Sequence, residues 1–287
     1  MNTRYTLPFL AFFVVLASSL QSQYIVDYTI GDFEGAKRFS IDPVGNIFVS
    51  DTDANRVLKL NLRGDVLATF GGKGWQQNQL DHPLGIDARF GIEVYVADYG
   101  NNRVVQLDKY LNFIATFERG VGANPEEQFG YPRSVSVNRL GDLYVLDYEN
   151  LRVLKVSTFS TIVDVFGNVE SGEGQITEPR DLVVDKNDVV YVLEPNRVVA
   201  FDPFGTFIWT TRNDKLDNAI SIAASDEILT VTTAQTVFLL DRKGRLQQLL
   251  TKADIAGMEK VPDFLQAVFF HDRLLILCSN YIIVLAS

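Results

Sequence analysis

The chain has 287 residues and a formal net charge of −10 at pH 7. This acidic balance argues against a nucleic-acid partner, because contacts with phosphates dominate that affinity. A single cysteine excludes a disulfide within the chain, and Cys278 is expected to be a buried core residue because it lies inside an apolar run.

The first predicted element is a secretory signal peptide at residues 1–22. Arg4 precedes an apolar stretch from Leu7 to Ala17, and a short polar tail follows. The apolar stretch is shorter than the roughly 20 residues that a membrane-spanning helix needs. We therefore expect cleavage after Ser22 and a bacterial protein that is periplasmic or secreted, with no membrane span after cleavage. An uncleaved membrane anchor is the alternative.

A repeated pattern organises residues 23–287. In "NIFVSDTDANRVLKL" an acid ends one apolar run and an arginine begins the next. The pattern recurs as Asp51 with Arg56, Asp98 with Arg103, Asp147 with Arg152, and Glu194 with Arg197. The acids lie 47, 49 and 47 residues apart. Two weaker copies, "ILTVTTAQTVFLL" and "LLILCSNYIIVL", keep the apolar runs without the charges, which gives six units.

Each complete unit contains four short apolar runs separated by turn signals. A proline or its substitute opens the first run, as in "HPLGIDA" and "YPRSVSV", and turns such as "PVGN" and "RLGD" follow. Four strands in roughly 45 residues are typical of a propeller blade. The sequence therefore predicts an all-β, six-bladed β-propeller of four-stranded antiparallel blades, in one domain.

The last unit lacks a strand, because the chain ends at "YIIVLAS" after three runs. An open sheet edge at this point would favour aggregation. The stretch "QYIVDYTIGDF" precedes the first complete unit. We expect Tyr24 to Ile30 to supply the outer strand of the sixth blade and so to join the two ends of the ring.

These motifs resemble those of the NHL-repeat family of six-bladed β-propellers. The matching stretches are "VSDTDANRV…ATFGG", "VADYGNNRV…ATF" and "VLDYENLRV…DVFG" in the first three units. The fourth unit matches in part, and the last two match in strand pattern only. The resemblance implies the fold, but one fold hosts many functions, so the function must be argued from particular residues.

We interpret the repeated acid and arginine pairs as structural. Each pair flanks one tight loop, which charge-assisted hydrogen bonds between the two side chains would fix. The alternative is a ring of metal-binding carboxylates around the channel. No cofactor is expected, although a calcium ion held by acidic loops such as "DTDAN" is a second alternative.

An enzyme acting in the channel is the competing class of function. Propellers that resemble this one include metal-dependent lyases and lactonases, whose histidines or carboxylates converge on a metal. Here His82 and His271 are expected on opposite faces, and no catalytic residue or metal ligand is assigned. The sequence favours a non-catalytic binding or scaffold module over a lactonase-like hydrolase or lyase.

The candidate binding surface is the face that carries the loops before each first strand, called here the proline-side face. Rigid folds commonly present binding sites on such loops. Alignment of the units gives equivalent positions to Lys37, Leu84, Arg133, Arg180, Asn218 and Phe264. We predict an anion site at the channel mouth, formed by Lys37, Arg38, Arg133 and Arg180. The alternative is that Asp181, Glu173 or Glu178 neutralises these arginines.

Four aromatic residues are predicted on the same face: Trp75, Tyr99, Tyr131 and Tyr148. Rigid aromatic side chains often anchor protein or sugar partners, although they also serve to pack loops together. We therefore expect a monomer that binds a protein partner or a small anionic or carbohydrate ligand at this face.

Overall fold

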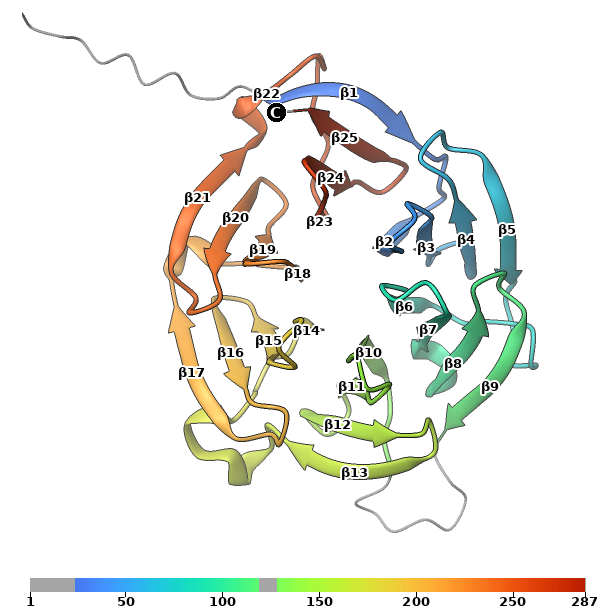
Figure 1. Ribbon diagram of the computed structural model, residues 1–287, viewed down its shortest axis with the longest axis vertical. Helices are drawn as coiled ribbons and strands as arrows, with labels where there is room; N and C mark the ends of the chain where they lie inside the picture. Colours follow the sequence, from blue (N-terminus) through green and yellow to red (C-terminus); the bar gives the residue numbers. More distant parts are fainter. Residues whose placement is uncertain (1–23, 119–127, 287) are drawn as a thin grey trace, which may run out of the picture.

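The computed structural model describes residues 24–118 and 128–286. Six β-sheets form a ring around a central channel, and Figure 1 looks along its axis. Within each sheet the strands follow one another from the channel to the rim. This architecture confirms the predicted six-bladed, all-β propeller. The predicted signal peptide lies outside the described residues, and within them no helix is long and apolar enough to cross a membrane.

The first three blades take their strands in sequence order. Blade 1 consists of β2 (Ala36–Ile41), β3 (Ile47–Asp51), β4 (Arg56–Leu60) and β5 (Val66–Gly71). Blade 2 consists of β6 (Pro83–Asp87), β7 (Glu93–Asp98), β8 (Arg103–Asp108) and β9 (Phe113–Glu118), with the short 3-10 helix η1 (Tyr99–Asn101) between β7 and β8. Blade 3 consists of β10 (Pro132–Val137), β11 (Leu143–Asp147), β12 (Arg152–Ser157) and β13 (Thr161–Phe166).

The next two blades repeat this order and add short helices in their loops. Blade 4 consists of β14 (Asp181–Val184), β15 (Val190–Glu194), β16 (Arg197–Phe201) and β17 (Phe207–Arg212). Blade 5 consists of β18 (Ser221–Ser225), β19 (Ile228–Thr232), β20 (Thr236–Asp241) and β21 (Leu246–Thr251). The 3-10 helices are η3 (Val169–Gly174), η4 (Asp214–Leu216) and η5 (Lys252–Asp254).

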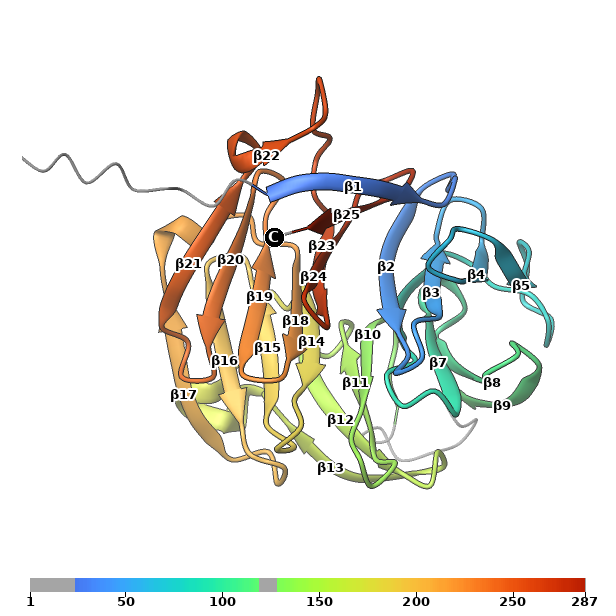
Figure 2. The same ribbon diagram turned by 45° about the horizontal axis from the view of Figure 1, so that its top comes forward.

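Blade 6 joins the two ends of the chain. It consists of β23 (Gln266–Phe270), β24 (Arg273–Leu277), β25 (Ile282–Ala286) and β1 (Tyr24–Ile30). Strand β1 pairs antiparallel with β25, and Figure 2 shows the two strands side by side. The predicted closure by the N-terminal strand is therefore confirmed. The short strand β22 (Ile255–Ala256) adds a parallel pairing on the outer edge of β1, which the sequence pattern did not predict.

The hydrophobic core lies between neighbouring blades. Every residue of β3, β11 and β15 is buried, as expected for strands that are covered on both faces. Six apolar clusters fill the spaces between blades, and one of them contains Cys278. Burial raises the pKa of the Cys278 thiol to about 12, so this residue is an unreactive part of the core, as predicted.

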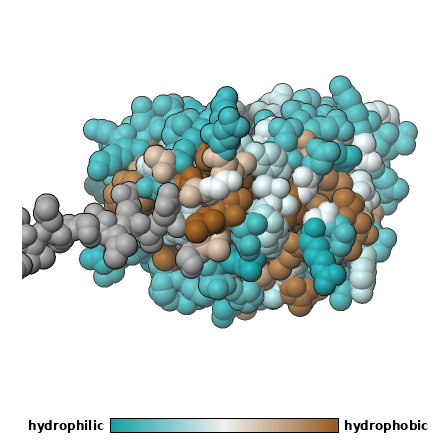
Figure 3. Space-filling model, turned by 90° about the horizontal axis from the view of Figure 1, so that it is seen from above, coloured by the Kyte–Doolittle hydropathy of each residue, from teal (hydrophilic) through white to brown (hydrophobic). Residues whose placement is uncertain are grey.

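The rim of the ring is mixed in character. Figure 3 views it from the β1 side and shows apolar patches among mostly hydrophilic atoms. Ile25 in β1 is 57% exposed. Other outer strands also carry single exposed apolar side chains, such as Leu67 at 51%. Single exposed apolar residues are normal on protein surfaces, and by themselves they do not mark a binding site.

Candidate functional site

The acid and arginine pairs fasten loops together. In blade 2, Arg103 Nε donates to Asp98 Oδ2 at 2.8 Å, and the two side chains are only 8% and 0% exposed. Arg103 also donates to the backbone oxygens of Gln76 and Gln79, while Asp98 Oδ1 accepts from the backbone N of Asp81 at 2.7 Å. The pair therefore ties the loop after β7 to the loop before β6.

The other three pairs make the same kind of connection. Arg56 and Arg152 contact their acids at 2.8 and 2.9 Å, and Arg197 forms an ion pair with Glu194. Each acid also accepts from the backbone of the loop that leads into its blade: Asp51 from Glu34 and Gly35, Asp147 from Gly130, and Glu194 from Thr177 and Glu178. All four contacts stay within one blade, which is the arrangement expected of a structural element.

The pKa values of two of these acids shift in opposite directions. Burial raises the pKa of Asp98 above its ordinary value, although Asn101, the Asp81 backbone and Arg103 all donate to the carboxylate. For Glu194, burial acts in the same direction, but hydrogen bonds from Arg197 and the backbone of the preceding loop outweigh it and hold the pKa below 4.5.

The predicted basic residues meet at one mouth of the channel. They line a cavity of about 260 Å³ on the proline-side face, which we call the basic cup. Its lining residues are Lys37, Arg38, Leu84, Arg133, Arg180, Ile220 and Leu265. The sequence therefore indicated the four cations, but not all the residues that share the cavity with them.

Two of the six aligned positions were wrong. Ile220 and Leu265, rather than Asn218 and Phe264, line the cup in blades 5 and 6. The backbone N atoms of Arg180, Ile220 and Leu265 each donate to the corresponding residue of the second strand. Phe264 is instead fully buried in the core. Blades 5 and 6 lack the proline that marks the start of the first strand in blades 2, 3 and 4.

The cations of the cup differ in their partners. Arg38 pairs with Asp181 at 3.1 Å, and Arg180 forms an exposed pair with Glu178 at 2.5 Å. Within the described residues, Lys37 and Arg133 have no carboxylate partner. Neutralisation by neighbouring acids, the alternative left open by the sequence, thus applies to two of the four cations.

Arg133 is held by its surroundings rather than by an opposite charge. Its Nε donates to the backbone oxygen of Arg180 at 3.0 Å, and its guanidinium lies 5.0 Å from the ring centre of Tyr148. Burial lowers the pKa of Arg133, and the neighbouring charges of Arg38 and Arg180 lower it further. The positive potential in the cup is therefore only partly compensated.

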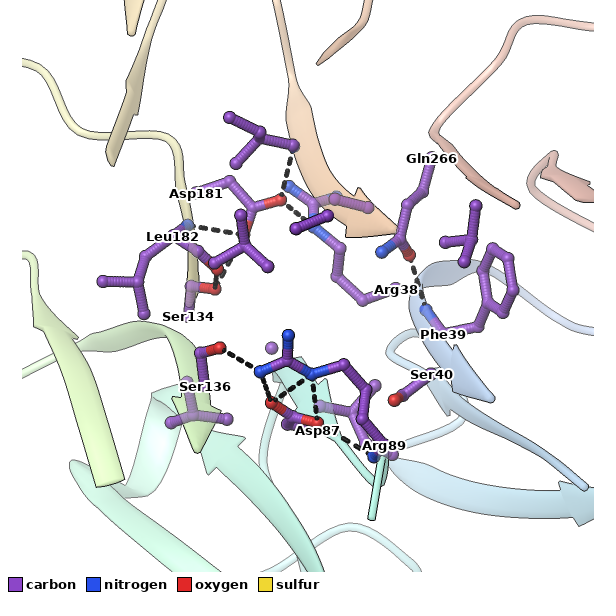
Figure 4. A pocket seen from close by; sticks show the side chains of 18 of the residues that line it. Arg38, Phe39, Ser40, Asp87, Arg89, Ser134, Ser136, Asp181, Leu182 and Gln266 are labelled. Carbon is purple, nitrogen blue, oxygen red and sulfur yellow. Dashed lines mark hydrogen bonds and ion pairs between the residues drawn. The ribbon is translucent and has the colours of Figure 1, made fainter. Parts of the chain in front are cut away.

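Hydrogen-bonded arginines close the floor of the cup. Arg38 donates across the channel to Asp181 and to the backbone oxygen of Ile220. Below it, Arg89 forms an ion pair with Asp87 at 2.7 Å and donates to Ser136 Oγ at 2.7 Å (Figure 4). The cavity that remains between these groups is about 60 Å³, so the basic cup is a blind hollow.

Sequence reasoning missed Arg89 and Asp87. The sequence did contain an indication of their role. Asp87 occupies the position that Ser40 and Ser136 hold in the first strands of blades 1 and 3. A carboxylate on the innermost strand needs a cation nearby, and Arg89 follows two residues later. An acid at a position where other blades have a small polar residue could therefore have indicated the hydrogen-bond network of Asp87 and Arg89 in the channel.

The four aromatic residues are arranged in different ways. Tyr148 lies against Arg133, and the rings of Tyr99 and Tyr131 contact each other with centroids 5.3 Å apart. Tyr131 is 43% exposed, and Trp75 is 78% exposed in the loop between β5 and β6. Aromatic surface therefore lies beside the cup over blades 2 and 3.

The two histidines are separated, as expected. His82 contacts Asp81 at 2.8 Å in the loop before β6, whereas the ring of His271 packs against Phe270 in the turn between β23 and β24. In the described parts of the chain, no three histidine, cysteine or acidic side chains are grouped to hold a metal. The mid-channel carboxylates Asp87 and Asp181 both bind arginine.

Comparison with known sequences finds an NHL repeat in the chain. The NHL repeat model matches residues 129–156, which include the third acid and arginine pair. The chain is a six-bladed β-propeller that contains an NHL repeat. This NHL propeller is 27% identical over 143 residues to the protein brain tumor of Drosophila melanogaster, and 30% identical over 146 residues to NHL repeat-containing protein 3 of Mus musculus. The matches cover 48% and 43% of this chain, but only 13% and 42% of those proteins.

Solved structures share the fold of this NHL propeller. An inactive virginiamycin B lyase from Staphylococcus aureus, solved with quinupristin, aligns with a TM-score of 0.62 and 13% identity, over 88% of this chain and 80% of the lyase. A gluconolactonase from Xanthomonas campestris aligns with a TM-score of 0.61 and 14% identity, over 90% and 88% of the two chains. At such identities the likeness concerns the fold alone.

Proposed function

We propose that this NHL propeller is a non-catalytic binding or scaffold module that captures its partner on the proline-side face. The observation that carries the proposal is the basic cup, in which Lys37 and Arg133 have no carboxylate partner among the described residues. NHL propellers are commonly protein-binding scaffolds. The aromatic surface of Tyr99 and Tyr131 beside the cup adds the kind of rigid contact that anchors a partner.

The cup favours a partner with an anionic group, either a protein or a small extracytoplasmic ligand. Like charges that converge in a hollow repel one another unless a counter-charge is supplied. A bound anion supplies that charge. Because Arg38 crosses the channel below the cup, the anion would approach from the proline-side face. A neutral carbohydrate would use the aromatic surface but leave the charges of the cup unmatched.

We favour a binding function over lactonase-like or lyase-like catalysis because of the mid-channel carboxylates. Asp87 and Asp181 each form an ion pair with an arginine at 3.1 Å or less. Their oxygens are therefore engaged in holding the innermost strands together. The lyase and lactonase structures support the shared fold, and the proposal assigns no catalytic residue to this chain.

We further propose that residues 1–22 direct export and that the mature chain is a monomer from Gln23 onward. The support is the charged, apolar and polar order of the N-terminal residues. Intact-mass analysis of protein recovered from a bacterial host should find a chain that begins at Gln23. A full-length mass in the membrane fraction would favour an anchor instead.

Affinity capture tests the proposed function. Purified propeller is immobilised and exposed to the extracytoplasmic fraction of its source, beside a variant carrying Arg133→Glu and Arg180→Glu. We expect the variant to lose the captured partner while its melting temperature stays nearly unchanged, because both side chains lie at the channel mouth. Equal capture of the partner by the parent protein and the variant would refute the assignment of the proline-side face as the binding surface.

A further inference from the structure

The lining of the basic cup contains two chemically different kinds of side chain. Its cations come from blades 1, 3 and 4, and aliphatic side chains come from blades 2, 5 and 6. Arg133 and Arg180 stand on adjacent blades, as do Ile220 and Leu265. In ring order the blades are thus cationic, aliphatic, cationic, cationic, aliphatic and aliphatic, so a ligand that fills the cup meets both charge and hydrocarbon.

The free hydrogen-bond donors belong to Arg133 and Lys37, on the blades that flank Leu84. Arg133 uses Nε to bond the backbone of Arg180, and its two Nη atoms have no hydrogen-bond partner among the described residues. Lys37 likewise donates to no side chain there. A carboxylate has the geometry to accept two hydrogen bonds from one guanidinium, which makes it a suitable counter-ion for Arg133.

The aliphatic lining residues argue against a bare inorganic anion. Phosphate or sulfate in the cup would lose hydration against Leu84, Ile220 and Leu265 without gaining hydrogen bonds from them. A neutral apolar molecule would bury hydrocarbon but leave the Arg133 charge unmatched. Only a molecule that joins an anionic group to an apolar part satisfies both kinds of lining residue.

The size and closure of the cup limit how such a molecule enters. Its volume of about 260 Å³ lies below the roughly 300 to 1,000 Å³ of pockets that enclose a whole drug-sized ligand. Arg38 closes the floor through its bonds to Asp181 and Ile220. The cup can therefore hold the end of a molecule but cannot let a chain pass through the channel.

We propose that the cup binds amphiphilic carboxylates, meaning a terminal carboxylate whose neighbouring carbons are apolar. The carboxylate pairs with Arg133 and Lys37, and the adjoining hydrocarbon packs on Leu84, Ile220 and Leu265. This inference rests on the proposed function, because it names the chemical class that the proline-side face recognises. It includes a free carboxyl terminus of a partner protein that ends in an apolar residue.

Calorimetry with small probes tests the proposal on the purified propeller. Hexanoate and phenylacetate are the probes, phenylacetamide lacks the charge, and acetate and inorganic phosphate lack the hydrocarbon. We expect hexanoate and phenylacetate to bind at least about tenfold more tightly than acetate or phosphate, and phenylacetamide not to bind detectably. Phosphate binding as tight as that of hexanoate, or equal binding of phenylacetamide, would overturn the proposal.

Two variants and a control separate the contributions of the cationic and the aliphatic lining residues. Arg133→Gln should abolish hexanoate binding, whereas Leu84→Asn should weaken hexanoate toward the level of acetate. Arg63→Gln, in an exposed turn on the opposite face, serves as the matched control and should bind like the parent protein. Unchanged hexanoate binding in Arg133→Gln would contradict the proposed position of the carboxylate.

The affinity-capture experiment distinguishes this inference from the function on which it rests. If the partner is captured through Arg133 and Arg180 but no probe carboxylate binds, the ligand class is wrong and the binding face stands. If the charge-reversed variant captures the partner as well as the parent protein does, the face itself is wrong. Probe binding that Arg133→Gln abolishes supports the ligand class.

Discussion

Arg103 is the most buried of the four repeated arginines, with a side chain 8% exposed, whereas Arg56 is 30% exposed. Arg103→Ala would leave Asp98 buried without its counter-charge, which commonly costs about 3–5 kcal/mol. Arg56→Ala should cost less, because water reaches the Arg56 side chain, although Asp51 is itself buried. Urea unfolding of both variants measures the difference.

Partner capture should be unaffected in both arginine variants, because neither side chain lines the basic cup. A variant of Arg103 that keeps normal stability but loses its partner would reverse the structural assignment. Equal losses of stability in the two variants would show that burial does not set the strength of these pairs.

The lowered pKa of Glu194 predicts an acid-sensitive contribution to stability. The folded state binds this proton less tightly than the unfolded state, so the pair stabilises the protein above the ordinary pKa of 4.5 and loses this effect as the pH falls below it. Glu194→Gln should therefore lower the melting temperature at pH 7. The difference between parent and variant should shrink toward pH 3, and a difference that widens in acid would contradict the sign.

At the residue scale, the sequence could predict a charge pair because it repeats, but not the partners that come from elsewhere in the chain. Asp98 and Arg103 stand five residues apart on either side of one loop, so their contact follows from local spacing. The backbone oxygens that Arg103 also contacts belong to a loop whose path depends on the neighbouring blade. Asp181, which pairs with Arg38, lies 143 residues away; the sequence suggested it as a neutralising acid but not which arginine it would contact.

Strand β1 holds the ring closed at the element scale. It pairs with β25 from Ile25 to Ile30, and Ile30 is fully buried in the core between blades 6 and 1. Deleting Gln23 to Ile30 removes this strand and exposes the edge of β25, so we expect unfolding or aggregation. Size-exclusion chromatography and thermal melting report both outcomes.

The matched control for this deletion is a chain that begins at Gln23. It keeps β1 and should remain monomeric with normal melting. If the chain lacking Gln23 to Ile30 also stayed monomeric and melted normally, closure by β1 would not be needed for stability.

Element order was predictable because four apolar runs recur in each unit, whereas the register of the late blades was not. Proline marks the start of β6 and β10, where it fixes the backbone and lacks an N–H donor. The first strands of blades 5 and 6, β18 and β23, begin without it. The cup residues of these blades therefore lie one or two positions beyond those expected from the repeat.

At the scale of the whole molecule, arginines in the channel connect the blades. Arg89 belongs to blade 2 and donates to Ser136 in blade 3 and to the backbone oxygen of Val184 in blade 4. Arg89→Ala would remove these links and leave Asp87, which is nearly fully buried, without its cation. We expect a loss of about 3–5 kcal/mol in urea unfolding.

Arg139→Ala is the matched control for this prediction, because Arg139 lies exposed in the corresponding turn of the next blade. Its stability should stay within about 0.5 kcal/mol of the parent protein. Equal stability of the two variants would mean that the channel network does not hold the ring together.

The central claim is that the proline-side face, through the basic cup, is the binding surface. The most direct measurement is the dissociation constant of the captured partner for three proteins: the parent, the variant with Arg133→Glu and Arg180→Glu, and a variant with Arg139→Glu and Lys186→Glu on the opposite face. We predict that the first pair of substitutions weakens binding at least about 100-fold, that the second pair leaves it unchanged, and that all three proteins melt alike. Binding that survives reversal of Arg133 and Arg180, or that is lost only with the opposite-face substitutions, would contradict the account.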